Sequence, residues 1–423
     1  KDDFYEAALI TCNAAIRFAE RYAMKAEFLA NDERNPERKA ELIRLAEVCR
    51  RCPAQPADSF YEAMQSLWFT QVLLHLNSRE ASISPGRFDQ YMYPFYRRDI
   101  DSGALTNLQA EELMACLWIK FNELRVFTDI ITYQNIIVGG TDAFGNDATN
   151  DLTWLCLKTT AMIEGSQPSL TMRWHEGTPP ELLNTACEIN LMGSGKPALF
   201  NDHINIPALK ATGLSQEEAR DYMIVGCEEL SVPGKIFGLV RAGTLNNPRC
   251  LLKALEGDPE RFSDFDDVLG SYRQQLAVEL KDRFQRTYAK DQRNAENTPH
   301  PFVSLLFDDC LERGIDITKG GVRHNLTSIS EGGTVTAANS LYVIKKAVFE
   351  DKIFTMAQLK DAIDKNFEGY EWIRSYCINK VPKFGNDLDE VDEFTAAIVE
   401  MNHTVVEDLN MKNFVGGTYI IGS

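Results

Sequence analysis

The chain lacks the sequence signatures of several classes of protein. Its six histidines show no HExxH motif or other metal-ligand spacing, and no Gly-x-Ser-x-Gly nucleophile turn occurs. No uncharged run reaches the roughly 18 residues that a membrane helix needs. No signal peptide is recognised at the start of the chain. We therefore expect a cytoplasmic protein without a zinc, haem or iron–sulfur site.

Basic residues are scarce relative to acidic ones. The chain carries 44 Lys and Arg against 62 Asp and Glu, for a net charge of −18 and a pI near 4.9. This balance argues against nucleic acid and acidic membrane surfaces as partners. It leaves open small anions that are bound by individual arginines.

The ten cysteines do not form a disulfide framework, because they are scattered singly apart from Cys49 and Cys52. This usage is typical of a reduced, cytosolic chain. Cys49-x-x-Cys52 has the spacing of a redox motif, but it ends a helical pattern and no second pair lies nearby to complete a zinc site. We interpret the pair as structural, with a redox role as the alternative.

What the chain does have is enough apolar sequence for a large core. With 423 residues, 44% of them hydrophobic, it can form one large domain or two. Helical periodicity dominates both ends, and short β-like runs alternate with helices between about 130 and 245. The pattern predicts an α/β layer or barrel that is mostly helical by residue count. The predicted strands cover 134–138, 170–174, 198–200 and 223–225, and the main predicted helices cover 1–51, 60–76, 108–124, 151–163, 179–192, 215–222, 244–256, 263–296, 334–350, 357–365 and 388–408.

The stretch 222–235 carries the most distinctive chemistry. A short apolar run ends at Gly226, and Cys227 follows with Glu228 and Glu229 behind it. In an extended segment residues i and i+2 point the same way, so Cys227 and Glu229 are predicted to face one volume. Neighbouring acids disfavour a thiolate, which indicates a thiol that reacts by giving up a hydrogen atom. The alternative is a buried structural cysteine beside surface acids.

A second candidate segment is 80–91. Ser84-Pro85-Gly86 predicts a loop, and the charges of Arg87 and Asp89 follow it among aromatic residues. The segment is either a substrate-facing loop or a turn that is held by a salt bridge.

Gly226-Cys227-x-Glu229, together with the upstream stretch 82–91, resembles the glycyl radical enzymes, in particular the dehydratase and lyase branch of the pyruvate formate-lyase-like family. The similarity covers nearly the whole chain in order, and the motifs are specific only in combination. Further matching stretches are 58–65, 199–202, 319–321, 333–340 and 382–387.

The resemblance implies a fold and a mechanism. The family fold is a ten-stranded α/β barrel of two half-barrels surrounded by helices, of which this chain would be the central part. An activating enzyme that uses S-adenosylmethionine and an iron–sulfur cluster would place a radical on a glycine near the C-terminus. Cys227 would become the thiyl radical, and Glu229 would be the acid/base. The resemblance also implies a homodimer and anaerobic metabolism.

The chain departs from the family pattern in ways that affect its function. It contains no Arg-Val-x-Gly-aromatic motif, so we expect residues 1–423 to be the central part of the domain, without the glycine radical domain and inactive alone. A single Cys227 disfavours the acyl transfer of pyruvate formate-lyase, which uses two adjacent cysteines. Ala81 and Arg241 replace a His and an Asp of the diol dehydratases, which disfavours glycerol and propanediol.

Ser82, Arg87 and Arg241 form the predicted substrate-binding set. A guanidinium at Arg241 would suit an anionic substrate. The alternative is that Arg241 pairs with Glu228 or another acid in the loop. The sequence thus predicts a carbon–oxygen or carbon–nitrogen lyase acting on a small polar substrate. The alternatives are formate C-acetyltransferase-type acyl transfer, a radical decarboxylase, and a non-catalytic truncated paralogue with a structural or binding role.

Overall fold

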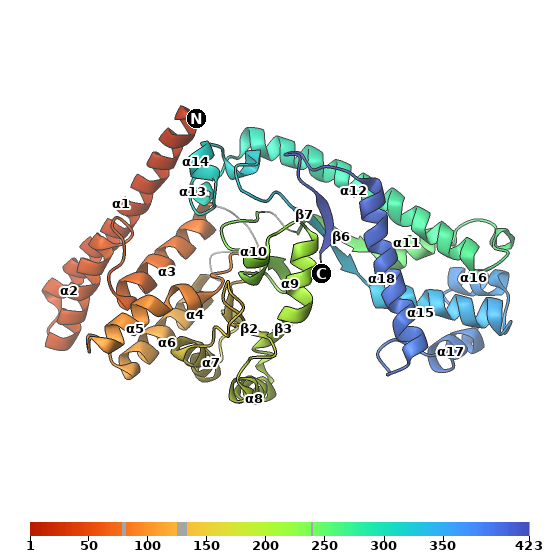
Figure 1. Ribbon diagram of the computed structural model, residues 1–423, viewed down its shortest axis with the longest axis horizontal. Helices are drawn as coiled ribbons and strands as arrows, with labels where there is room; N and C mark the ends of the chain where they lie inside the picture. The colour runs from red at the N-terminus through yellow and green to blue at the C-terminus, as the bar shows by residue number, and fades with distance from the viewer. Residues whose placement is uncertain (78–81, 125–132, 238–239, 423) are drawn as a thin grey trace. The chain divides into compact units, whose positions relative to one another are not determined.

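The computed structural model describes residues 1–77, 82–124, 133–237 and 240–422, with the side chains at 240 and 241 excepted (Figure 1). These residues form two compact units. The first joins Lys1–Phe237 to Pro299–His324, and the second joins Gly238–Thr298 to Asn325–Ser423.

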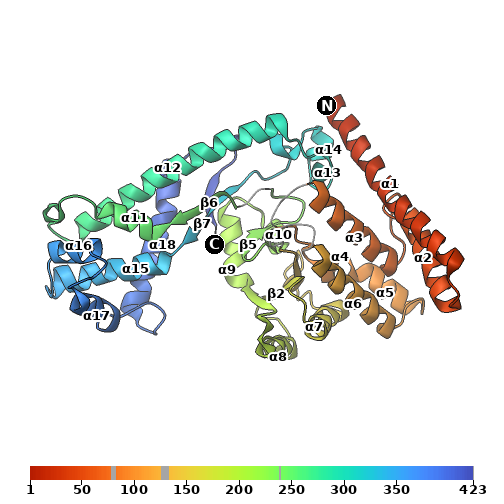
Figure 2. The same cartoon turned by 180° about the vertical axis from the view of Figure 1, so that it is seen from behind.

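The first unit begins with a helical hairpin. Helices α1 (Asp2–Asp32) and α2 (Pro36–Arg51) lie side by side in both views (Figure 2). Alanines on one face of α1 are buried, and their small side chains let the two helices approach closely. The sequence predicted one helical stretch over 1–51, which is wrong between the two helices. There Asn35 caps α2 by accepting hydrogen bonds from two backbone N–H groups, and Pro36 occupies its first turn.

A parallel sheet forms the centre of the first unit. Its strand order is β1 (Asn135–Gly139), β2 (Ser169–Trp174) and β3 (Ala198–Asn201). Every residue of β1 is buried, as expected for a parallel strand that is covered on both faces. Ser82 and Gly86 add parallel bridges to Tyr133 and Ile136 on the free edge of β1. The other elements of this unit are α3 (Phe60–Asn77), α4 (Phe88–Tyr91), α5 (Tyr93–Asp101), α6 (Asn107–Glu123), α7 (Asp151–Met162), α8 (Pro180–Ile189), α9 (Asp202–Ala211), α10 (Gln216–Arg220), β4 (Met223–Val225), β5 (Glu229–Ser231), α13 (Pro301–Ser304) and α14 (Cys310–Arg313).

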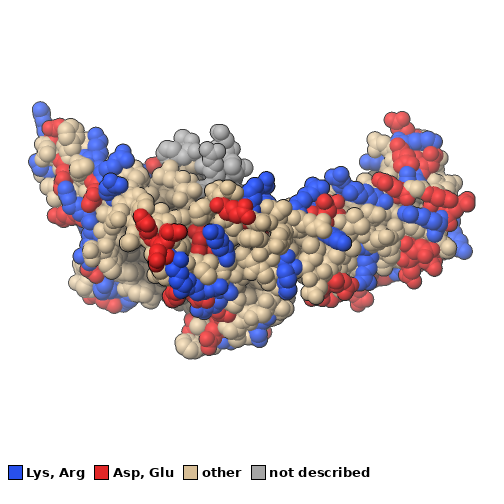
Figure 3. All heavy atoms as spheres, turned by 90° about the horizontal axis from the view of Figure 1, so that it is seen from above, with Lys and Arg blue, Asp and Glu red and all other residues tan. Residues whose placement is uncertain are grey.

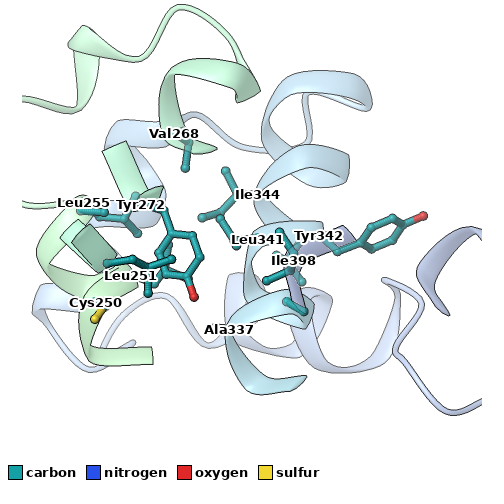
Figure 4. Close-up of a cluster of buried hydrophobic side chains, with 14 of the residues drawn as sticks. Cys250, Leu251, Leu255, Val268, Tyr272, Ala337, Leu341, Tyr342, Ile344 and Ile398 are labelled. Carbon is teal, nitrogen blue, oxygen red and sulfur yellow. The ribbon is translucent and has the colours of Figure 1, made fainter. Parts of the chain in front are cut away.

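The second unit has its own parallel sheet, in the order β6 (Val240–Asn246), β7 (Thr327–Gly332) and β8 (Tyr419–Gly422). Its core is apolar, and Tyr272, Leu251 and Ile344 converge in it (Figure 4). On the sheet, Tyr419 stacks on Phe284 with the ring centroids 4.0 Å apart. The α-helices of this unit are α11 (Asn247–Ala254), α12 (Phe265–Asn297), α15 (Thr334–Val343), α16 (Met356–Asp364), α17 (Glu371–Asn379) and α18 (Asp389–Leu409), and a π-helix, η5 (Ile344–Glu350), continues α15.

The predicted fold class is confirmed in outline, with local corrections. The four predicted strands are present as β1 to β4, within one residue at their ends. The helix predicted over 244–256 is wrong at its start, because β6 continues to Asn246, whose side chain then caps α11. The sequence did not predict the strands β5, β6, β7 and β8, nor the helices α4, α5, α9, α13, α14 and α17.

The surface and the remaining cysteines add few functional signals. Acidic and basic side chains are interspersed over the face in Figure 3. No helix within the described ranges is long and apolar enough to span a membrane. Within those ranges, no group of three or more His, Cys, Asp or Glu side chains is placed so that it could hold a metal ion. Cys49 and Cys52 are buried free thiols, and burial raises the pKa of Cys49 to about 11, which fits a structural role.

Candidate active site

Cys227 lies at the tip of a β-hairpin. Strands β4 and β5 pair antiparallel with Val225 opposite Glu229, so that 226–228 form the turn and the Cys227 side chain is exposed. Gly226 has a φ of +71°, a conformation that glycine adopts without strain. A Cβ at Gly226 would also meet the Glu229 carboxylate at 2.5 Å and the Ser82 hydroxyl at 3.0 Å. The tip is therefore too crowded for a side chain at this position.

Glu229 stabilises the turn at the hairpin tip by accepting hydrogen bonds from its backbone. Its Oε2 accepts hydrogen bonds from the backbone N–H groups of Cys227, at 3.0 Å, and Glu228, at 3.1 Å. The sequence predicted that Glu229 and Cys227 would face one volume. The structure brings the two residues together, but one carboxylate oxygen binds the backbone of the turn. A proton from a ligand would therefore be exchanged at the other oxygen, Oε1.

Ser84 and Asn135, which the sequence did not single out as site residues, hold the Gly226 backbone. The Ser84 hydroxyl accepts hydrogen bonds from the backbone N–H of Gly226 (3.4 Å) and of Asn135 (3.2 Å). The Asn135 amide in turn donates to the Gly226 carbonyl at 3.2 Å. Asn135 is only 2% exposed, and its Oδ1 is buried with no hydrogen-bond partner among the described residues. Both polar groups of the Gly226 backbone are thus fixed.

Tyr133 is the third residue that the sequence did not single out. Hydrogen bonding with the Cys227 side chain, and then the charge of that side chain, raise the pKa of Tyr133. Ser82 bridges to Tyr133 along the edge of β1. Cys227, Glu229, Ser82 and Tyr133 therefore form one cluster. The available signal was the position of Tyr133 directly before the predicted strand 134–138.

The base of the hairpin is anchored by a buried ion pair. Arg173 on β2 makes two contacts with Asp202, Nε to Oδ1 at 2.9 Å and Nη2 to Oδ2 at 2.8 Å, and both side chains are almost fully buried. Nη1 of Arg173 donates to the backbone carbonyls of Arg220 (2.8 Å) and Tyr222 (3.2 Å). The Tyr222 ring lies under the guanidinium, 4.0 Å away, and its hydroxyl donates to Asp202. The chain that enters β4 is therefore bound on both its backbone and its side chain.

Arg87 belongs to this anchor and not to the cluster at the tip. Its guanidinium is buried and donates to Asp221 at 3.0 Å and to the carbonyl of Thr141 at 2.9 Å. Burial, and then the charge of Arg173, lower the pKa of Arg87. The structure thus favours the salt-bridge interpretation of this segment, and Asp89 binds the backbone N–H of Gly139 instead.

Arg241 lies in β6, and its side chain is outside the described residues. Neither a contact with substrate nor the alternative pairing with Glu228 is tested, so its role stays a prediction. Ala81 is also outside the described ranges.

Comparison with known proteins identifies the family. The model of the family "Pyruvate formate lyase-like" matches residues 1–422. The chain belongs to this family. It is 34% identical to trans-4-hydroxy-L-proline dehydratase of Clostridioides difficile over 93% of this chain and 53% of that protein. The chain thus spans about half the length of the curated relatives it matches.

Solved structures confirm the fold of this pyruvate formate-lyase-like chain. A structure from work on 1,2-propanediol dehydration in Roseburia inulinivorans is 39% identical, with a TM-score of 0.91 over 99% of this chain and 56% of that one. A glycyl radical enzyme from Archaeoglobus fulgidus is 34% identical, also with a TM-score of 0.91, over 99% of this chain and 56% of that one. The predicted glycyl radical enzyme fold is therefore confirmed. Within the described residues, its strands are the two three-stranded parallel sheets and the cysteine hairpin.

Replacing Arg173 tests the anchor. Arg173→Met leaves the Asp202 charge buried without its partner, so we expect the free energy of unfolding to fall by about 3–5 kcal/mol in denaturant titrations. The double variant Arg173→Met/Asp202→Asn removes the unpaired charge and should lose less. Arg97→Met breaks two exposed pairs, with Asp101 and Asp151, and each should cost less than about 1 kcal/mol. Equal losses for Arg173→Met and Arg97→Met would contradict the anchor.

Replacing Gly226 tests the crowding at the tip. Gly226→Ala adds backbone strain and a clash, and Gly103→Ala is a matched control because Gly103 has a similar φ of +73° with nothing within 4 Å of its Cβ position. Backbone strain costs about 1–3 kcal/mol in both variants. We expect Gly226→Ala to be the more destabilising in thermal unfolding, and to change the rate at which iodoacetamide alkylates Cys227. A Gly226→Ala variant that matches Gly103→Ala in both measurements would exclude a steric role.

Proposed function

We propose that this chain carries the thiyl site of a glycyl radical lyase, which eliminates water or another small group from a small polar substrate. The observation that most supports this proposal is the hairpin tip, where one exposed thiol lies in a cluster with a carboxylate, a serine and a tyrosine. Membership of a family whose similar members include a dehydratase supports this proposal.

The radical would come from outside the described residues. A glycyl radical, installed by an activating enzyme that uses S-adenosylmethionine and an iron–sulfur cluster, would supply the unpaired electron. The site fits such a donor because Cys227 is exposed at the end of a turn whose backbone is fixed. A hydrogen atom can therefore leave the sulfur without rearrangement of the loop.

Cys227 would then act on the substrate by hydrogen-atom transfer. The sulfur radical takes a hydrogen atom from a substrate carbon, so that an S–H bond forms and a C–H bond breaks. The substrate carbon now carries the unpaired electron. After the elimination, the same hydrogen atom returns from the Cys227 thiol to the product radical. Cys227 then carries the unpaired electron again and can return it to the glycine.

Glu229 would move the proton. As a carboxylate it would accept a proton at Oε1 from a hydroxyl on the radical carbon, where a C=O bond forms while the bond to the leaving group on the adjacent carbon breaks. Glu229 would then give that proton to the leaving group, which departs as water or another neutral molecule. Oε2 stays on the two backbone N–H groups of the turn. Ser82 lies close enough to the carboxylate to bind a substrate hydroxyl, and the Tyr133 hydroxyl orients the sulfur.

Arg241 bears on the class of substrate. We propose a substrate with an anionic group that Arg241 binds, which the carboxylate of hydroxyproline in the similar dehydratase supports by analogy. A single cysteine at the tip argues against acyl transfer of the formate-lyase type. A radical decarboxylase and a non-catalytic binding role remain the alternatives. The partners we propose are the activating enzyme and a second copy of the chain, in the cytoplasm.

Replacing Cys227 separates the lyase from the non-catalytic role. In the natural protein that contains this chain, activated without oxygen, Cys227→Ala removes the hydrogen-abstracting sulfur and should abolish product formation from hydroxylated carboxylates and diols. Cys116→Ala, at another exposed cysteine, should leave turnover unchanged. Turnover that persists in Cys227→Ala would exclude the thiyl mechanism.

Replacing Arg241 tests the anionic substrate. Arg241→Ala should raise KM for an anionic substrate by about tenfold or more, because a charge-assisted pair is lost, and should leave KM for a neutral diol unchanged. Arg241→Lys keeps the charge without the planar two-point geometry and should give an intermediate KM. Unchanged KM values for every anionic substrate in Arg241→Ala would contradict the proposal that Arg241 binds an anionic group.

A further inference from the structure

The first unit contains a hollow that the hairpin does not use. Its volume is about 610 Å³, and residues that follow all three strands of the parallel sheet line it. Thr141 comes shortly after β1, His175 directly after β2, and Asp202 directly after β3. Open α/β sheets bind ligands at this carboxyl end of their strands, and the volume is in the range of small-molecule sites.

The walls of the hollow are closely packed. Helices α9 and α10 form one side, and the loops after β1 and β2 form the other. A Cβ at Gly177 would meet the His175 ring at 2.9 Å, and one at Gly145 would meet the Arg220 guanidinium at 2.7 Å. The two glycines therefore let the loops approach the side chains that line the hollow.

Asp202 and Asp147, two of the acidic residues that line the hollow, each have a hydrogen-bond partner. Asp202 is bound by Arg173, and Asp147 Oδ1 lies 3.1 Å from His175 Nε2. Nδ1 of His175 accepts the backbone N–H of Gly177, so Nε2 carries the proton and donates to Asp147. Glu176 lies at the exposed rim, 3.8 Å from His203.

Two cationic side chains also line the hollow. Within the described part of the chain, neither Lys210 on α9 nor Arg220 on α10 has a carboxylate partner within 4.0 Å. Arg220 donates from Nη1 to the carbonyl of Ala143, which holds its guanidinium beside the hollow. Lys210 and Arg220 therefore bring two positive charges to this edge of the sheet, where the carboxylates of Asp147 and Glu176 also lie.

We propose that this hollow is a second binding site, for a small molecule with a carboxylate or phosphate group that Lys210 and Arg220 hold. It is separate from the cysteine hairpin. Gly226 contacts Asn135 at the start of β1, whereas the hollow opens beyond Gly139 at its end, and four residues of strand span roughly 13 Å. The proposal does not depend on Cys227 being catalytic.

Calorimetric titration of the natural protein that contains this chain with inorganic phosphate, at ionic strength held constant with chloride, tests the site. We expect saturable binding that weakens about tenfold or more in Lys210→Gln and survives in Lys210→Arg, because the charge is what binds. Lys39→Gln, which removes an exposed lysine on α2, is the matched control and should bind like the parent. A titration with acetate shows whether a carboxylate suffices.

Two results would overturn the proposal: no heat from phosphate or acetate up to about 50 mM, or equal affinity in Lys210→Gln and the parent. Mass spectrometry adds a positional readout on the same samples. Phosphate should slow the acetylation of Lys210 and leave the alkylation of Cys227 unchanged. Phosphate that instead protected Cys227 would place the anion at the hairpin and exclude the second site.

Discussion

The contact between Arg173 and Asp202 is the constraint on which the candidate site depends. Removing two charges from water is unfavourable unless each finds several partners, and here the guanidinium has a carboxylate, two backbone carbonyls and an aromatic face. The neighbouring chain is fitted to it: a Cβ at Gly140 would lie 2.4 Å from Nε of Arg173. The direction in which β4 leaves the sheet, and hence the position of Cys227, follows from this packing.

The parts of the fold that could be predicted are those in which the local sequence and the packing agree. β1 contains the apolar run Ile136–Val138 and is buried on both faces, so its pattern alone indicates a strand. β7 is different: its sequence is mostly polar, yet Thr327 and Ser328 are buried, and the Thr327 hydroxyl accepts a hydrogen bond from the Asn413 amide. The break between α1 and α2 had a recognisable signal in Asn35-Pro36, which the helical periodicity on either side concealed.

The site could be predicted where the chemistry is local and was missed where it comes from distant segments. Gly226, Cys227 and Glu229 are adjacent in sequence and unusual in combination. Asn135 is 91 residues from Gly226 and is an ordinary residue at the start of a strand. Arg87 attracted attention as a charge in a loop, but its partner Asp221 is 134 residues away. Charge alone does not distinguish a ligand contact from a buried ion pair.

The way in which the hairpin is held bears on how such a site can diversify. Arg173 binds the segment that enters β4 by two main-chain carbonyls of that segment, and every residue type has such a carbonyl. Substitutions around the tip, at positions such as Tyr133 or Ser82, therefore leave that grip in place. A lineage of enzymes can exchange one substrate for another by changing the few side chains that surround a sulfur atom, whose location is inherited with the scaffold.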